Sequence, residues 1–332
     1  EENVKTPDKS MYYGFFLNEL LPRVKNASLI NFMGGEPTLH PHFNDILSRT
    51  LESMQPFSFL GIFTNGLMPD KVLDLLLHTV GRGGSIERQI QFSILLNWQT
   101  MENISEKNHA RCREVAEAVL SKNGFGLMFS LNLYSVDQDL YTQCQEIDEI
   151  YQDLGLPEGQ KYKIRVSPAF PIVGEQSNHA LPIKDYPKMG RMMLDMVKEF
   201  PQMCFRFDCS FPPCLLDEIE EDEYPLVERF FYHGSQSVPN ITEWKDRDFY
   251  FGCADDSPMD IDPKGDCFNC FPFHNKKLGN VQDFQQINEL STTKMHTKFL
   301  GHVFEAEPNE PCKSCPHYMV RCSSGCFAYN FA

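Results

Sequence analysis

The sequence predicts an α/β protein with a mainly parallel sheet and a smaller cysteine-rich domain at its carboxyl end. Three observations lead to this fold class. Between residues 27 and 210, short β-rich runs alternate with longer segments whose apolar residues recur every three or four positions. This alternation then stops, and seven of the twelve cysteines fall within residues 253–332. A hydrophobic content of 42% over 332 residues is enough for an ordinary globular core.

Six runs rich in β-branched and aromatic residues are the predicted strands. They span residues 28–33, 57–64, 89–97, 126–134, 162–167 and 204–208. Each pair is separated by a segment long enough for a crossover helix, which is the connection that parallel neighbours need. We therefore expect a partial (β/α)6 barrel of the TIM type over residues 1–210.

The segments between these strands have helical periodicity. In the first, Phe43, Ile46, Leu47 and Leu51 recur on one face, and a helix over residues 11–23 is expected to precede the whole series. Cys112 and Cys144 stand alone inside such segments, and we interpret them as buried structural side chains.

The remaining chain has two further parts. Residues 211–250 are acidic and aromatic, and we predict a linking lobe over the sheet in which the acidic run 217–223 is a solvated surface. Residues 251–332 are rich in cysteine, glycine and proline but poor in periodic apolar residues. This last domain is therefore expected to need metal in order to fold.

Charge and hydropathy exclude two classes of partner. Thirty Lys and Arg against 46 Asp and Glu give a net charge of −16, which repels a phosphate backbone, so nucleic acid is not an expected partner. No run of about 18 apolar residues is present, and the first residues are too polar for a signal peptide, so no membrane association is expected. We expect a cytoplasmic protein whose cysteines are metal ligands.

A short turn, Gly34-Gly35-Glu36-Pro37, follows the first predicted strand. Functional groups of parallel β/α folds gather at the carboxyl ends of strands. Glycines let the backbone approach a ligand, and Glu36 is suited to receive a cationic ammonium group. A tight turn without a ligand is the alternative interpretation.

Other predicted strands deliver small polar side chains to the same edge. They are Thr64, Asn65, Ser93, Asn97, Asn132 and Arg165. Asp208 ends the sixth run and is a candidate acid or base, with a helix cap or turn as the alternative role.

The carboxyl-terminal cysteines have the spacing of metal ligands. Separations of two to six residues join Cys312, Cys315, Cys322 and Cys326. Such close spacing brings thiolates onto one ion or cluster, and tetrahedral zinc is an alternative to an iron-sulfur cluster.

Together these motifs resemble the radical S-adenosylmethionine superfamily, in the branch with a carboxyl-terminal SPASM domain. The resemblance rests on residues 34–41 and 64–66 and on the cysteine pattern, in the order that family uses. It implies that Gly34, Gly35, Glu36 and Pro37 hold the methionine amino group of the cofactor. Ser93, Asn97, Asn132 and Arg165 would contact its ribose or carboxylate, or would make structural hydrogen bonds.

The SPASM resemblance also implies two auxiliary [4Fe-4S] clusters. Cys253, Cys270 and Cys326 would bind the first, and Cys312, Cys315 and Cys322 the second. The fourth ligand of the first cluster is open, with Cys214, Cys209 and Cys267 as candidates and Cys214 preferred. The gap between Cys315 and Cys322 is one residue longer than the family's usual five, and no cysteine follows Cys326.

The catalytic [4Fe-4S] cluster of this superfamily needs a Cys-x3-Cys-x2-Cys loop, and no cysteine precedes Cys112. We expect that loop and the first strand upstream of this sequence. A degenerate homologue without the cluster is the alternative.

The implied activity is that of a peptide or protein maturase. A 5′-deoxyadenosyl radical would modify a side chain of a peptide or protein substrate by oxidation, crosslinking or epimerisation, with flavodoxin or ferredoxin as electron donor. The alternatives are an anaerobic sulfatase-maturing enzyme and a non-catalytic iron-sulfur or zinc scaffold for electron transfer.

Overall fold

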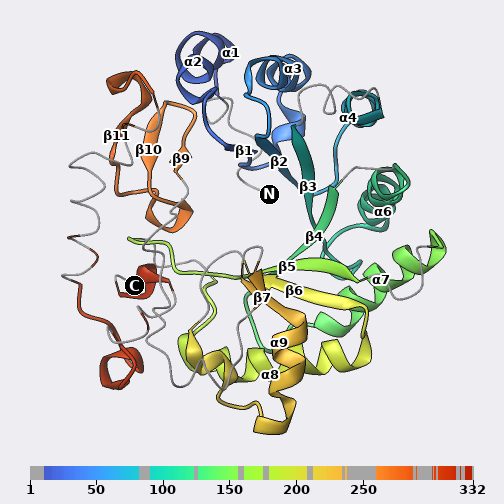
Figure 1. The fold of residues 1–332 in the computed structure, drawn as a ribbon, viewed down its shortest axis with the longest axis vertical. Coiled ribbons are helices and arrows are strands. Elements are labelled where there is room, and N and C mark those ends of the chain that lie inside the picture. Colours follow the sequence, from blue (N-terminus) through green and yellow to red (C-terminus); the bar gives the residue numbers. More distant parts are fainter. Residues whose placement is uncertain are drawn as a thin grey trace.

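The structure is a computed structural model. It describes residues 11–81, 90–122, 126–155, 161–174, 179–207, 212–233, 236–237, 259–286, 289, 301, 303, 306–318, 322 and 326–330. An eight-stranded sheet with helices along its outer side forms the larger part, and a three-stranded sheet lies beside the amino-terminal helical segment (Figure 1).

In the large sheet the strands lie side by side in the order in which they occur along the chain, β1 to β8. Strands β1 to β7 are parallel, and β8 returns antiparallel to β7. The strands are β1 (Leu29–Phe32), β2 (Phe59–Thr64), β3 (Gln91–Asn97), β4 (Gly126–Leu133), β5 (Tyr162–Pro168), β6 (Met203–Phe207), β7 (Phe231–His233) and β8 (Gln236–Ser237).

All six predicted strands are confirmed, and the parallel α/β arrangement with them. Two short strands were missed, because the predicted alternation stopped at residue 211 while β7 and β8 extend the sheet beyond it. No pairing joins β1 to β8 within the described residues, and the partial barrel stays a prediction.

A helix follows most strands and returns the chain to the next one. These helices are α3 (Phe43–Ser53), α4 (Asp70–Gly81), α6 (Glu106–Leu120), α7 (Leu140–Asp153), α8 (Tyr186–Glu199) and α9 (Tyr224–Phe230). Side-chain oxygens of Ser105 and Asp139 cap α6 and α7 by accepting backbone N–H groups of the first turn. Among the described helices, none has the length and apolar character to span a bilayer.

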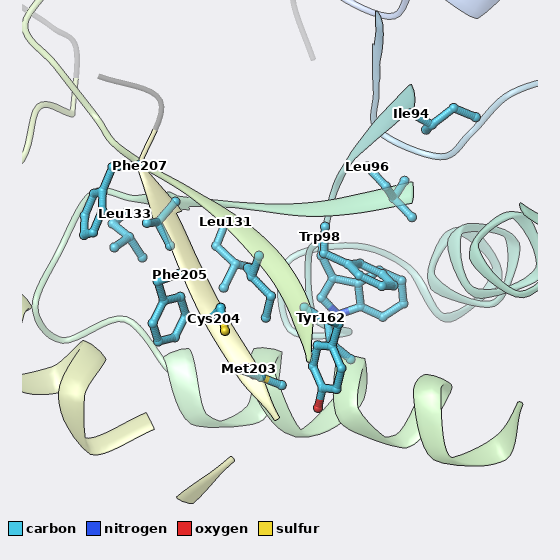
Figure 2. Close-up of a cluster of buried hydrophobic side chains, with 14 of the residues drawn as sticks. Ile94, Leu96, Trp98, Leu131, Leu133, Tyr162, Met203, Cys204, Phe205 and Phe207 are labelled. Carbon is cyan, nitrogen blue, oxygen red and sulfur yellow. The ribbon is translucent and has the colours of Figure 1, made fainter. Parts of the chain in front are cut away.

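The hydrophobic core lies between the sheet and these helices. Alternate residues of each strand face it, and Ile94, Leu131, Leu133 and Phe205 are fully buried there (Figure 2). The strand residues between them face the other side of the sheet and include polar side chains such as Asn97 and Arg165. This opposite side is called the polar face below.

A second apolar cluster joins the amino-terminal helical segment to the small sheet. The amino-terminal helical segment, α1 (Tyr13–Phe15), a π-helical stretch (Phe16–Leu20) and α2 (Leu21–Val24), confirms the predicted helix over 11–23. Its buried residues pack against the small sheet of β9 (Asp260–Ile261), β10 (Asp266–Phe268) and β11 (Gly279–Asn280). Arg23 Nε donates a hydrogen bond to the carbonyl oxygen of Phe284 at 2.8 Å.

The carboxyl-terminal residues contact the start of α8 and the loop between β5 and α8. The hydroxyl groups of Tyr186 and Tyr329 lie 3.3 Å apart, and Tyr329 also donates to the carbonyl oxygen of Leu181. Val173, after β5, donates its backbone N–H to Pro272 at 2.9 Å. The cysteine-rich region is therefore joined by hydrogen bonds to α8 and to the loop that precedes it.

Candidate functional site

The Gly34-Gly-Glu-Pro turn begins just after β1, at its carboxyl end. Gly34 has φ +137°, a conformation that strongly favours glycine. Glu36 is extended and precedes a short 3-10 helix, Pro37–Leu39, whose Thr38 N–H its carboxylate accepts at 3.2 Å. The conformation of the turn itself therefore explains why a glycine stands at position 34 and a carboxylate at position 36.

The same carboxylate also binds the end of the neighbouring strand. Thr64 Oγ1 lies 2.9 Å from each carboxylate oxygen of Glu36, and the Asn65 backbone N–H donates to one of them at 2.7 Å. Thr38 Oγ1 adds a fourth donor at 2.5 Å. Glu36 therefore joins the loops after β1 and β2, and its carboxylate is satisfied by this chain's own donors.

The two glycines of the turn are open to a ligand. A Cβ atom added at Gly34 or Gly35 would have no heavy atom within 4 Å, and both residues are exposed. By contrast, a Cβ atom at Gly66, in the loop after β2, would lie 2.9 Å from Cys112 Sγ. The backbone at 34–35 is thus the accessible part of the turn, and it offers N–H and C=O groups to an approaching molecule.

The predicted binding residues of the strands share the polar face. In the sheet register, Asn97 is opposite Ser130, and Ser130 is opposite Arg165. Ser93 and Asn132 have the same side-chain parity along their strands. The structure therefore brings Ser93, Asn97, Asn132 and Arg165 to one side of the sheet, but Ser93 lies near the start of β3, four positions before Asn97 at its carboxyl end. A shared contact of all four with one cofactor stays a prediction.

Hydrogen bonds connect part of this row. Arg165 Nη1 donates to Ser130 Oγ at 2.6 Å, and its guanidinium carbon lies 5.3 Å from the ring centroid of Phe63. Asn132 Nδ2 donates to Asn97 Oδ1 at 3.2 Å. Sequence reasoning missed Ser130 and Arg206, which continue the row on β4 and β6. The alternation of side chains along a strand could have identified them, because Ser130 is two residues before Asn132 and Arg206 is next to the buried Phe205.

Three predicted site residues lie outside the described residues. They are Asp208, Cys209 and Cys253.

Two isolated cysteines are buried, as predicted. Cys112 is 2% exposed and Cys144 is fully buried, both in the main hydrophobic core. Cys112 donates its thiol to the carbonyl oxygen of Asn65 at 3.0 Å, and burial raises the pKa of this thiol to about 11. Burial likewise raises the pKa of the Cys144 thiol, which explains both as unreactive packing residues.

Four of the predicted metal ligands lie in one electrostatic neighbourhood. Cys214, in the 3-10 helix Pro213–Leu216 after β6, has its pKa raised first by burial. The charges of Cys322, Cys312 and Cys315 contribute further to this rise. Cys326, Cys312 and Cys214 together also raise the pKa of Tyr329, so thiols from two distant parts of the chain act on the same region, and the pKa shifts do not divide them into two ligand sets.

Neighbouring thiols do not yet make a metal centre. None of the ten cysteines in the described part of the chain is in a disulfide. Within the same residues, no three Cys, His, Asp or Glu side chains form a group that could hold a metal ion. The geometry of the described thiols therefore does not distinguish iron from zinc, and metal binding stays a prediction.

The remaining candidates separate into two environments. Cys270 and Cys326 pack against the main core, close to Tyr329, whose N–H donates to the carbonyl oxygen of Cys326 at 3.2 Å. Cys267 is fully buried in the other apolar cluster, with Val281 and Phe284. Burial raises the pKa of the Cys267 thiol to about 12. Among the residues that the structure describes, Cys267 is therefore surrounded by packing side chains rather than by the other candidate ligands.

The fold and this site define an α/β protein whose parallel sheet carries an open glycine turn, a polar face and a docked cysteine-rich region. No protein-family model and no curated protein matches the chain. Its function is therefore inferred from the residues themselves.

Proposed function

We propose that this protein is a radical S-adenosylmethionine enzyme with a SPASM-type domain that modifies a peptide or protein side chain. The observation that carries the proposal is the pair of open glycines beside a carboxylate that joins two strand-end loops. The turn lies at the edge of a polar face with Asn97 and Arg165, at the end of the sheet where ligands of α/β folds bind.

In this proposal the backbone of Gly34 and Gly35 binds the amino-acid head group of S-adenosylmethionine. Glu36 acts mainly as a positioning residue, because its carboxylate already accepts hydrogen bonds from Thr38, Thr64 and Asn65. Asn97 and Arg165, which share the polar face, would contact the ribose. If it is bound beside a reduced [4Fe-4S] cluster, S-adenosylmethionine would supply the chemistry for hydrogen-atom abstraction from the substrate, and this chain's turn would orient it.

The cysteines would hold the auxiliary iron-sulfur clusters. Cys312, Cys315 and Cys322 with Cys214 form one proposed ligand set, and Cys270 and Cys326 belong to the other. The electrostatic proximity of Cys214 to the first three supports that set. The proposed location is cytoplasmic, and a flavodoxin or ferredoxin is the proposed electron donor.

The binding test uses isothermal titration calorimetry with S-adenosylmethionine. Gly35→Val adds a side chain where the structure has open space, so it should leave the thermal midpoint unchanged while lowering affinity at least tenfold. Gly301→Val is the matched control, since Gly301 also has no atom within 4 Å of an added Cβ and lies outside the turn. A folded wild-type protein that does not bind S-adenosylmethionine would overturn the proposal.

The metal content of anaerobically reconstituted protein, expressed from the complete gene, is the second test. Iron and sulfide in the ratio of [4Fe-4S] clusters, together with reductive cleavage of S-adenosylmethionine, are expected. Zinc in their place, without cleavage, would indicate the scaffold function instead.

A further inference from the structure

We propose that Arg111 of α6, which lies outside the candidate site, is a positioning residue that sets the conformation of the glycine turn, residues 34–37. No role was predicted for Arg111 from the sequence. The proposal depends on the loop after β2, residues 65–69, which is called the β2 loop below. Arg111 binds one end of this loop, Glu36 binds the other end, and the middle packs tightly on α6.

The guanidinium of Arg111 holds the end of the β2 loop that leads into α4. Its Nη2 and Nε both donate to the carbonyl oxygen of Met68, at 2.8 and 3.3 Å. Nη2 also lies 2.7 Å from a carboxylate oxygen of Asp70, the first residue of α4, and Nη1 pairs with Glu114 at 2.8 Å. Hydrogen bonds from a charged donor are about twice as strong as neutral ones. Arg111 therefore fixes the place where the loop joins α4.

The glycine turn holds the other end of the β2 loop. The Asn65 backbone N–H donates to the Glu36 carboxylate at 2.7 Å, and the Asn65 side-chain oxygen accepts the Leu67 N–H at 3.0 Å. Asn65 is thus bonded both to the turn and to the residue before Met68. A displacement of Met68 is therefore transmitted through Leu67 and Asn65 to Glu36.

Between its two ends the β2 loop is pressed against α6. A Cβ atom added at Gly66 would lie 2.9 Å from Cys112 Sγ and 3.1 Å from Cys112 Cα. The Cys112 thiol also donates to the carbonyl oxygen of Asn65 at 3.0 Å. Close-packed groups of this kind do not deform continuously, so the loop cannot shift toward the helix. The neighbouring residues Arg111 and Cys112 together determine where Asn65 lies.

Electrostatics also places Arg111 and Glu36 in one neighbourhood. Burial is the main cause of the raised pKa of the Cys112 thiol, the Glu36 carboxylate raises this pKa further, and the Arg111 guanidinium lowers it. A charge shifts a pKa in this way only when it lies near the titrating group. The Cys112 thiol is therefore close to both charged groups that bind the β2 loop.

Arg113 shows what an arginine of α6 does when it only joins helices. It pairs with Glu117 of the same helix at 2.8 Å and with Asp153 of α7 at 2.6 Å. Neither partner belongs to a loop of the candidate site. Arg111 likewise has two acidic partners, and α4 and α6 lie next to each other on the outer side of the sheet (Figure 1). The bond to the Met68 carbonyl is what distinguishes Arg111, so Arg113 is its matched control.

The first experiment measures amide hydrogen exchange of the full chain by mass spectrometry, without an added ligand. Arg111→Gln should speed exchange in the peptide covering residues 33–39 as well as in the β2 loop. The reason is that loosening one end of the loop weakens the Asn65 bond to Glu36, and with it the capping of the Thr38 N–H by the same carboxylate. Arg113→Gln should exchange as wild type in both peptides.

Two results of this measurement would overturn the proposal. Wild-type exchange at residues 33–39 in Arg111→Gln would mean that the arginine holds only the β2 loop. Equal acceleration in Arg113→Gln would mean that any lost ion pair of α6 has the same effect. Arg111→Lys keeps the charge without the planar donors and should show intermediate exchange at 33–39. If Arg111→Gln does not fold, wild-type exchange in Arg111→Lys overturns the proposal instead.

Chemical rescue tests whether the bond to Met68 is the cause. A cavity of about 410 Å³ adjoins Met68 and Arg111, so a small ion can reach the place of the missing side chain. In Arg111→Ala, guanidinium at concentrations far below those that unfold proteins should restore slow exchange at residues 33–39. Tetramethylammonium at equal ionic strength has no N–H donor and should not. Equal restoration by both ions, or by neither, would contradict control of the turn through this bond.

The last experiment, calorimetry with S-adenosylmethionine, rests on the proposed function. An ordered turn loses less entropy on binding, so Arg111→Gln should lower the affinity about tenfold, as is typical of coupling between separate positions. Arg113→Gln should bind as wild type. Unchanged affinity in Arg111→Gln, with wild-type binding intact, would overturn the positioning role. If wild type does not bind S-adenosylmethionine but exchange at residues 33–39 depends on Arg111, the proposed function fails while the positioning of the turn stands.

Discussion

The hydroxyl group of Thr64 lies 2.9 Å from both carboxylate oxygens of Glu36, across the two loops that end β1 and β2. Thr64 is buried, and its Oγ1 also accepts the backbone N–H of Gly66 at 3.0 Å. One hydroxyl therefore links the glycine turn to the Thr-Asn-Gly loop. The shape of the turn depends on this link as much as on its glycines.

Thr64→Val removes that link at nearly constant volume. We expect a loss of about 1–3 kcal/mol in the free energy of unfolding, because Gly66 N–H and the Glu36 carboxylate each lose a partner. Affinity for S-adenosylmethionine should also fall. Urea denaturation measures the first effect and calorimetry the second.

Thr50→Val is the matched control for Thr64→Val. Thr50 is equally buried, and its hydroxyl donates to the Ile46 carbonyl within α3 at 2.8 Å, away from the turn. It should cost stability without changing cofactor affinity. An equal loss of affinity in both variants would contradict a specific role of the Thr64 link.

Cys214→Ser tests the proposed ligand set that combines Cys214 with Cys312, Cys315 and Cys322. Because Cys214 lies in the electrostatic neighbourhood of Cys312, Cys315 and Cys322, we expect reconstituted protein to lose iron and sulfide in proportion to one cluster. Iron and acid-labile sulfide analysis measures this loss. Unchanged metal content would remove Cys214 from the ligands.

Cys267→Ala provides the contrasting case. Cys267 is fully buried with Val281 and Phe284, so its replacement should lower the free energy of unfolding through lost packing. Its metal content should equal that of wild type. Loss of a cluster in this variant would contradict its interpretation as a packing residue.

Much of the fold could be predicted from sequence because the helix-facing strand residues are strongly apolar. Phe129, Leu131 and Leu133, or Phe205 and Phe207, alternate with polar neighbours and mark a strand whatever its partners are. β7 and β8 have three and two residues, too few for any periodicity to show. Their place in the sheet is decided by pairing with β6, which sequence alone does not reveal.

The candidate site could be predicted only where its residues follow one another in the chain. Gly34 to Pro37 form a local motif, whereas the Glu36 contact with Thr64 spans 28 positions. The row through Ser130, Arg165 and Arg206 requires the register between three strands. Cys214 likewise meets Cys322 only through the fold, since the 3-10 helix that holds it packs against α8.

Asp260 of β9 should make stability depend on pH. Burial raises its pKa from 3.8 to about 6, opposed in part by a hydrogen bond from the Phe271 backbone. The folded protein therefore binds the proton more tightly than the unfolded chain. The stability contribution of protonated Asp260 is present at low pH and is lost as pH rises from about 4 through about 6.

Asp260→Asn should remove this dependence. Urea denaturation at several pH values should show that the variant gains stability relative to wild type as pH rises through that window. Asp74→Asn, an exposed residue of α4, controls for the loss of one negative charge. A constant difference between Asp260→Asn and wild type across the window would contradict the raised pKa.

Gly190→Ala tests the packing that positions Cys214. A Cβ atom at Gly190 of α8 would overlap the carbonyl oxygen of Leu215, which belongs to the same 3-10 helix as Cys214. Since backbone on both sides has to shift, we expect a loss of about 1–3 kcal/mol in the free energy of unfolding despite the higher helix propensity of alanine.

The displacement of Leu215 should also move Cys214 from its place beside Cys322. Gly190→Ala is therefore expected to reconstitute with less iron than wild type under conditions where both proteins are folded, as judged by circular dichroism. Gly301→Ala, which adds a methyl group in open space, should keep wild-type iron content. Full iron content in a destabilised Gly190→Ala protein would show that the metal sites do not depend on the contact between α8 and the Cys214 helix.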